Sequence, residues 1–105
     1  MEIHQFSRVG RLAMIGGLSG VNMDLPPFFT YLGFRAIPKG LNLVGLRRAG
    51  FSAEQIVALK RVYRLLYRSG LKLDDALGRI ETEVATPEAL HVAGFVRGSK
   101  RGIAR

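Results

Sequence analysis

The sequence predicts an α+β fold in which a coil of a parallel β-helix precedes three helices. Two observations support this prediction: an apolar period of six residues near the start of the chain, and an apolar period of 3.6 residues in its second half. A strict period of six fits neither an α-helix nor an ordinary strand, and it is typical of hexapeptide-repeat β-helices. The change of period after residue 50 predicts that helices follow there.

Residues 3–24 carry the six-residue repeat. Each rung of such a prism points one aliphatic side chain inward, and small residues stand where the chain turns. The repeat consists of four β-branched residues, three small residues and two glycines: Ile3, Val9, Ile15 and Val21; Ser7, Ala13 and Ser19; Gly10 and Gly16. Four rungs make little more than one coil, which cannot bury its faces without stacked neighbours. We therefore expect either a longer β-helix upstream or a partner that covers the open end.

Residues 24–50 are expected to connect the prism to the helices. Asp24-Leu25-Pro26-Pro27 ends the repeat, because two prolines remove two backbone donors. Aromatic side chains follow that we expect to pack between the two parts: Phe28, Phe29, Tyr31 and Phe34. Prolines and glycines between Ile37 and Gly50 predict irregular backbone. We divide the chain into a β-helix coil over 1–27 and a connecting loop with a helical domain over 28–105.

Three helices are predicted in the remainder of the chain. The first covers 52–68, and Ser52 with Gln55 forms a capping box at its start. The second covers 74–83 and has two aspartates in its first turn. The third covers 86–96 and begins with a Thr-Pro pair that suits a helix start.

Composition excludes several function classes. The chain has 105 residues, a formal net charge of +8 and no cysteine, so disulfides and thiolate metal sites are absent. His4 and His91 are far apart in sequence, and we expect no metal site. No apolar run is long enough for a membrane span. The positive charge could attract nucleic acid, anionic lipid headgroups or phosphorylated small molecules. Basic and aromatic residues do not interleave as they do in proteins that stack bases.

Several blocks of sequence occur in one order along the chain. They are His4-Gln5-Phe6, Gly16-Gly17-Leu18-Ser19-Gly20-Val21, Asp24-Leu25-Pro26-Pro27, Gly40-Leu41-Asn42-Leu43, Gly45-Leu46-Arg47-Arg48, Gly50-Phe51-Ser52, Arg68-Ser69-Gly70-Leu71 and Ser99-Lys100-Arg101-Gly102-Ile103. Together they resemble the C-terminal part of the acyl-carrier-protein-dependent UDP-N-acetylglucosamine O-acyltransferases of lipid A biosynthesis. The resemblance covers essentially the whole chain, but only the last two-fifths of the family's usual length.

The resemblance implies the terminal coil of a left-handed parallel β-helix, a C-terminal three-helix domain and a cytoplasmic homotrimer. Members of the family transfer a 3-hydroxyacyl chain from acyl carrier protein to the 3-hydroxyl of UDP-N-acetylglucosamine, without a cofactor. The family's general base is a histidine upstream of this segment, so we expect no catalytic residue here and leave open whether the chain alone is an enzyme. The basic residues Lys60, Arg64 and Arg68, spaced four apart, could contact the acidic carrier protein or simply face solvent.

Five positions correspond to site residues of the family. His4 and Gln5 match a His-Gln pair in the substrate cleft between subunits, and Gly17 matches the position that limits acyl-chain length. Asn42 matches an asparagine near the nucleotide, and Arg48 an arginine near its phosphates. The fork of an arginine suits phosphate because it donates two parallel hydrogen bonds.

Other positions depart from the family pattern. Val44 stands where a glutamate usually helps to hold the nucleotide, and Ala49 replaces a second arginine. Leu12 stands where histidine is common. These departures favour an alternative in which the chain is a non-catalytic assembly or binding module derived from the family.

Overall fold

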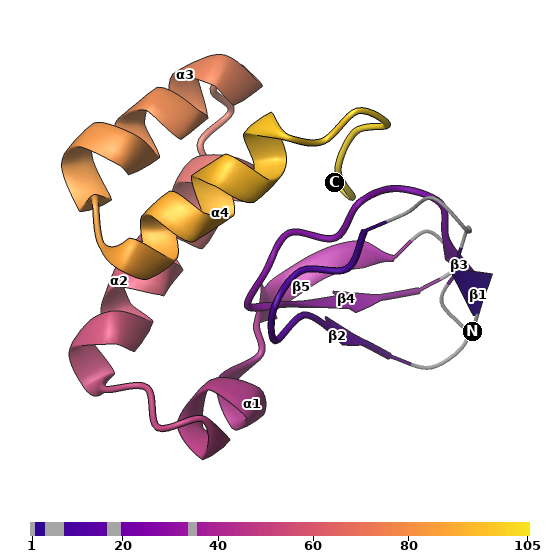
Figure 1. Cartoon of the computed structure of the whole chain (residues 1–105), viewed down its shortest axis with the longest axis horizontal. Coiled ribbons are helices and arrows are strands. Elements are labelled where there is room, and N and C mark those ends of the chain that lie inside the picture. Colours follow the sequence, from indigo (N-terminus) through magenta and orange to yellow (C-terminus); the bar gives the residue numbers. More distant parts are fainter. Residues whose placement is uncertain (1, 4–7, 17–19, 34–35) are drawn as a thin grey trace.

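The computed structural model describes residues 2–3, 8–16, 20–33 and 36–105 of the chain. Its short strands come first and its helices follow (Figure 1). The strands are β1 (Glu2–Ile3), β2 (Met14–Ile15), β3 (Gly20–Val21), β4 (Phe29–Leu32) and β5 (Ile37–Leu41). The helices are α1 (Leu43–Arg48), α2 (Ala53–Tyr63), α3 (Leu73–Arg79) and α4 (Pro87–Arg97), with π-helical turns η1 (Arg64–Arg68) and η2 (Ile80–Val84).

The six-residue repeat forms a coil whose strands pair in parallel with those of the next turn. In β1 and β3, Ile3 is paired with Val21, three repeats later. On a second side of the prism, Val9 forms a parallel bridge with Leu25. On the third side, Ile15 of β2 pairs with Tyr31 of β4. The predicted α+β fold, with a β-helix coil before the helices, is therefore confirmed.

The stretch from Ile37 to Gly50 is more regular than predicted. β5 pairs antiparallel with β4, and α1 follows at once. Pro38 lies in β5, which is at the edge of its sheet, where strands tolerate proline. Because β2 also pairs with β4, the β-sheet continues beyond residue 27, and the division into 1–27 and 28–105 stays a prediction.

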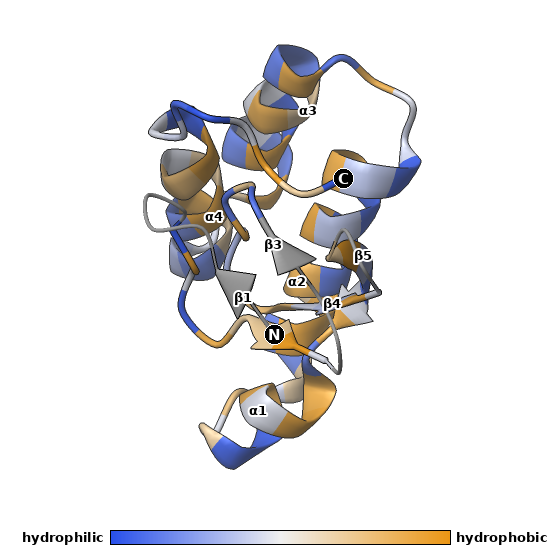
Figure 2. Ribbon diagram, turned by 90° about the vertical axis from the view of Figure 1, so that its right-hand side faces the viewer, coloured by the Kyte–Doolittle hydropathy of each residue, from blue (hydrophilic) through white to orange (hydrophobic). Residues whose placement is uncertain are grey.

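The three predicted helices are confirmed, each with a short π-helical turn or a small shift at its end. The Ser52 hydroxyl accepts from the Gln55 N–H, and the Gln55 side chain accepts from the Ser52 N–H, which completes the capping box at the start of α2. At the start of α4, Thr86 accepts from the Ala89 N–H. Hydrophilic and hydrophobic residues form separate stripes along these helices (Figure 2). No helix among the described residues is long and apolar enough to cross a membrane.

Aromatic packing joins the coil to the helices. Phe28, Phe29 and Tyr31 are completely buried, as predicted, whereas Phe34 lies outside the described residues. The centre of the Phe29 ring lies 5.2 Å from the centre of the Tyr63 ring on α2, in the edge-to-face arrangement that aromatic pairs prefer. The Tyr31 hydroxyl donates a hydrogen bond of 2.8 Å to the carbonyl of Pro26. The Phe29–Tyr63 contact joins α2 to β4, and the Tyr31 hydrogen bond holds β4 to the preceding segment of the coil.

The C-terminal segment returns to the coil after α4 (Figure 1). Ile103 forms a parallel bridge with Asp24 and is buried. The Asp24 N–H donates to the Gly102 carbonyl, and the Ala104 N–H donates to the Asp24 carbonyl, both at 2.9 Å. The tail thus adds one more strand-like segment to the last coil, a pairing that the sequence analysis did not predict.

Candidate functional site

Asn42 stands at the corner between β5 and α1, and its side chain holds that corner together. Its Oδ1 accepts a hydrogen bond from the Gly45 N–H at 3.1 Å, which caps the helix. Its Nδ2 donates to the Leu12 carbonyl of the first coil at 2.9 Å. A side chain at Gly45 would collide with this amide, which explains the glycine inside α1. Asn42 therefore positions α1 on the coil, with one N–H and part of its oxygen left for a ligand.

Arg48 lies at the other end of the same helix. Its side chain is exposed and, among the described residues, has no hydrogen-bond or ion-pair partner. α1 has six residues, so about 9 Å along its axis separates its two ends. Asn42 and Arg48 therefore flank α1 without touching one another, and a single ligand that contacts both must be an extended one.

The remaining family positions divide into two groups. His4, Gln5 and Gly17 lie outside the described residues, so their predicted contacts with substrate stay predictions. The positions that depart from the family pattern are described: Val44 is 59% exposed on α1, and Ala49 caps its C-terminus. Val44 thus presents an apolar side chain to solvent beside Asn42 and cannot accept a hydrogen bond there.

The basic stripe of Lys60, Arg64 and Arg68 runs along the outer side of α2 and η1. All three side chains are exposed, and within the described part of the chain none of them pairs with a carboxylate. Their neighbour Arg61 behaves differently, because its guanidinium pairs with Glu83 at 3.0 Å. The stripe therefore keeps its positive charge available to a partner.

Asp24 forms a junction between the coil and the tail that sequence reasoning missed. Its carboxylate is 2% exposed and accepts three hydrogen bonds: from the Arg8 N–H at 2.8 Å, from Arg8 Nε at 3.3 Å and from the Ser99 hydroxyl at 2.7 Å. Burial alone would raise the pKa of Asp24, but the hydrogen bonds and the positive charge of Arg8 outweigh it and lower the pKa below its ordinary value. No local pattern marks this junction, because 75 positions separate Asp24 from Ser99.

The described residues offer no metal site. No three histidine, aspartate or glutamate side chains among them gather as ligands. His91 lies on α4 with its ring 5.8 Å from Phe28, so it packs against the aromatic cluster.

Comparison with known proteins gives the family. The model of a family described as UDP N-acetylglucosamine O-acyltransferase, domain 2, matches residues 24–104. The chain belongs to this family. It is 48% identical over 103 residues to the acyl-[acyl-carrier-protein]–UDP-N-acetylglucosamine O-acyltransferase of Anaeromyxobacter sp. strain K. The aligned residues cover 97% of this chain and 40% of that protein. Its identity to the enzyme of the same name from Myxococcus xanthus is 47% over 104 residues, 98% of this chain and 40% of that protein.

Solved structures of UDP-N-acetylglucosamine acyltransferases share the fold. The Bacteroides fragilis structure matches with a TM-score of 0.94 and 43% identity, over 98% of this chain and 41% of that one. The Arabidopsis structure matches with a TM-score of 0.88 and 34% identity, over 98% of this chain and 40% of that one. The chain thus spans about two-fifths of the length of the curated relatives it matches.

Proposed function

We propose that this chain supplies the C-terminal part of a cytoplasmic UDP-N-acetylglucosamine O-acyltransferase of lipid A biosynthesis. The reaction moves a 3-hydroxyacyl chain from acyl carrier protein to the 3-hydroxyl of UDP-N-acetylglucosamine. The observation that supports this proposal is the family match over residues 24–104, together with 48% identity to a relative that bears the activity in its name. The chain contributes the last coil, the helical domain and one side of the substrate cleft.

In this proposal the binding residues are His4, Gln5, Asn42 and Arg48, and Gly17 limits the acyl-chain length. Arg48 holds phosphate oxygens of the nucleotide, since its guanidinium is exposed and has no protein partner among the described residues. Asn42 supports the same ligand from the opposite end of α1. No group in the chain serves as the general base, which the family keeps upstream.

The basic stripe of Lys60, Arg64 and Arg68 is the proposed contact for the acidic carrier protein. A row of unpaired cations attracts an acidic partner over a distance of about 8–10 Å at physiological salt and speeds its association. Arg61, on the same helix, is already paired with Glu83 and serves as a natural internal control.

One observation supports a coil stacked upstream, and the family resemblance supports a trimeric assembly. Val9, in the first coil, is 42% exposed, whereas its partner Leu25 in the next coil is completely buried. The open end of the prism therefore presents apolar surface that another coil would cover. A substrate cleft between subunits requires more than one copy of the chain, and the family resemblance implies that three copies assemble.

The alternative is a non-catalytic assembly or binding module. The exposed Val44 favours it, because an apolar side chain at this place contributes no hydrogen bond to a nucleotide. An acyl-transfer assay with hydroxyacyl carrier protein and UDP-N-acetylglucosamine tests the proposal on the 105-residue chain itself. We expect no turnover by this chain, because the base lies upstream. Turnover would contradict the expectation that the base lies upstream of this segment, and it would also contradict the non-catalytic alternative.

A further inference from the structure

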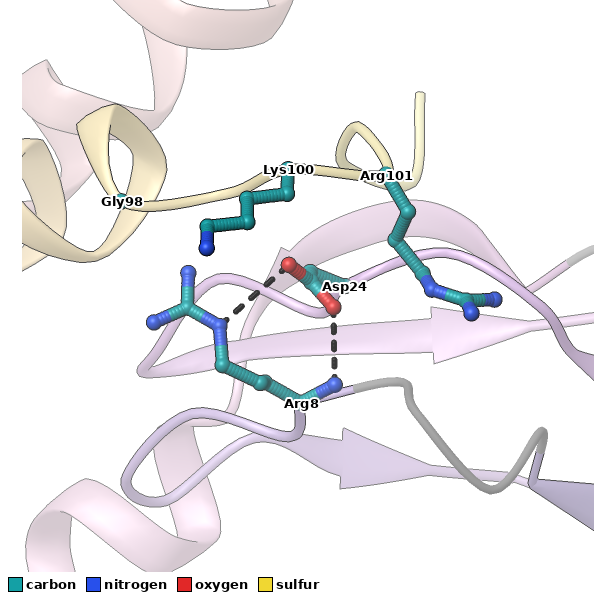
Figure 3. A pocket seen from close by; sticks show the side chains of 5 residues that line it. All are labelled: Arg8, Asp24, Gly98, Lys100 and Arg101. Atoms are coloured by element: carbon teal, nitrogen blue, oxygen red, sulfur yellow. Dashed lines mark hydrogen bonds and ion pairs between the residues drawn. The ribbon is translucent and has the colours of Figure 1, made fainter.

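A cationic pocket lies where the C-terminal tail crosses the coil. We call it the tail pocket; it has a volume of about 410 Å³ and is lined by Arg8, Asp24, Gly98, Lys100 and Arg101 (Figure 3). This volume falls within the range of about 300–1,000 Å³ that is usual for small-molecule sites. The pocket is formed by a cation from the first coil, two cations from the tail and one carboxylate.

Positive charge in the tail pocket exceeds negative charge by two. Asp24 is the one carboxylate among the described lining residues, and Arg8 and Ser99 already engage both of its oxygens. The Lys100 ammonium has no hydrogen-bond or ion-pair partner within the described part of the chain. By contrast, the helical arginines Arg79 and Arg97 each pair with a glutamate at 2.6 Å. Of the three cations of the tail pocket, Arg8 pairs with Asp24, whereas Lys100 and Arg101 have no carboxylate partner among the described residues.

Arg8 is held in place before any ligand arrives. Its Nε bonds Asp24, and its Nη2 donates to the Phe95 carbonyl at 2.7 Å. Its guanidinium also lies 4.3 Å above the centre of the Phe95 ring, a cation–π contact. These three contacts leave Nη1 as the free end of the fork. An arginine fixed in this way loses little conformational entropy when it binds an anion.

Lys100 points toward the Arg8 guanidinium. In Figure 3 its ammonium is directed toward the Arg8 guanidinium on one side of Asp24, while Arg101 extends on the other side. The Arg101 guanidinium donates to the Asn22 carbonyl at 3.1 Å and so ties the tail to the coil. Gly98 adds no side chain: a Cβ there would stand 3.6 Å from Arg8 Nη1, so the glycine keeps the approach to the guanidinium open.

We propose that the tail pocket binds a phosphoryl group in its dianionic form, between Arg8 Nη1 and the Lys100 ammonium. A dianion matches the excess charge of two, and guanidinium and ammonium groups are the usual side-chain partners of phosphate oxygens. The group is either free phosphate or a phosphomonoester, because the pocket has room for a substituent. Binding links the first coil to the tail and stabilises their contact. Arg48 on α1 is a different site, since none of the tail-pocket residues belongs to that helix.

The test is a titration of the full chain, followed by the amide NMR signals of Ser99, Lys100 and Gly102. The probes are inorganic phosphate and methyl phosphate, with sodium chloride adjusted to keep the ionic strength constant. We expect saturable shifts at these amides with at least one probe and none with chloride alone. If both probes give saturable shifts, the pocket can bind a phosphomonoester. If only inorganic phosphate does, the ligand is free phosphate. Either result supports the proposal.

Variants of Lys100 make the test specific. Lys100→Gln is expected to weaken binding about tenfold or more, since it removes a charge-assisted hydrogen bond. Lys100→Arg keeps the charge and is expected to restore binding to within a few-fold. The matched control is Lys72→Gln, which removes another exposed lysine, at the start of α3. No saturable shift with either phosphate, or equal binding by Lys100→Gln and the unmodified chain, would overturn the proposal.

Discussion

The carboxylate of Asp24 accepts a 2.7 Å hydrogen bond from the hydroxyl of Ser99, although the two residues are 75 positions apart. The same aspartate pairs through its backbone with the tail around Ile103. One buried residue therefore closes the last coil onto the C-terminal segment. Because the carboxylate is buried, its hydrogen bonds are not exchanged freely for bonds to water, and losing them is costly.

Replacing this aspartate tests its structural role. Asp24→Asn keeps the size of the side chain but places an amide where Arg8 and Ser99 donate, and it leaves the Arg8 charge without compensation. We expect a loss of about 2 kcal/mol in the free energy of unfolding, measured by urea denaturation. Asp75→Asn, an exposed aspartate in the first turn of α3, is the matched control and should change the free energy by less than about 0.5 kcal/mol. Equal effects of the two substitutions would contradict the role of Asp24.

The lowered pKa of Asp24 predicts how stability depends on pH. Because the pKa of Asp24 in the folded chain lies below its ordinary value of 3.8, the folded state binds this proton less readily than the unfolded state does. The stabilisation is therefore fully present above about pH 4 and is lost as the pH falls through the folded-state pKa. Urea denaturation between pH 7 and pH 2 measures this, with Asp24→Asn as the reference. The two curves should converge as the solution is acidified; a constant difference down to pH 2 would speak against this account.

Asn42 has two hydrogen-bonding functions that substitutions can separate. Asn42→Ala removes both the cap of α1 and the bond to Leu12, and should cost about 1–2 kcal/mol. Asn42→Asp keeps the capping oxygen but places a second carboxylate oxygen opposite the Leu12 carbonyl, so it keeps the cap and loses the bond to the coil. Amide hydrogen exchange in α1 distinguishes the two effects: protection near Gly45 should fall in Asn42→Ala and persist in Asn42→Asp. Loss of protection in both variants would show that capping is not the main role.

Arg48 and Arg47 form a matched pair for testing nucleotide recognition. Both are exposed and adjacent at the end of α1, but only Arg48 is proposed to hold phosphate. The assay uses a chimera in which the N-terminal part of the Myxococcus xanthus relative precedes this chain. Arg48→Gln should raise the KM for UDP-N-acetylglucosamine about tenfold or more, and Arg47→Gln by less than about twofold. A larger rise in KM for Arg47→Gln than for Arg48→Gln would assign the phosphate contact to Arg47.

The parts of the structure that could be predicted from sequence are those with local causes. The capping box of Ser52 and Gln55 lies within one helical turn, and the six-residue repeat directly reflects the geometry of the prism. β5 and α1 escaped prediction because Pro38 and Gly45 are ordinarily unfavourable in strands and helices. At these positions an edge strand tolerates the proline, and the amide of Asn42 requires the glycine.

Only part of the candidate site could be predicted from the sequence, because some of its contacts join residues that are far apart in the chain. Asn42 and Arg48 could be identified from a resemblance along the sequence, and the structure adds that they flank α1. The tail pocket and the Asp24 junction depend on contacts between Arg8 and residues near the C-terminus. Nothing in the local sequence around Arg8 or Lys100 indicates that the two residues line one pocket, because only the returning tail brings them together.

Acyl transfer by the chimera tests the central claim most directly, namely that this chain can serve as the C-terminal part of the acyltransferase. The chimera, purified and shown to be folded by circular dichroism, is supplied with hydroxyacyl carrier protein and UDP-N-acetylglucosamine. We predict that it forms the acylated sugar nucleotide, while the 105-residue chain alone does not. A folded chimera that binds neither substrate and gives no product would contradict the claim.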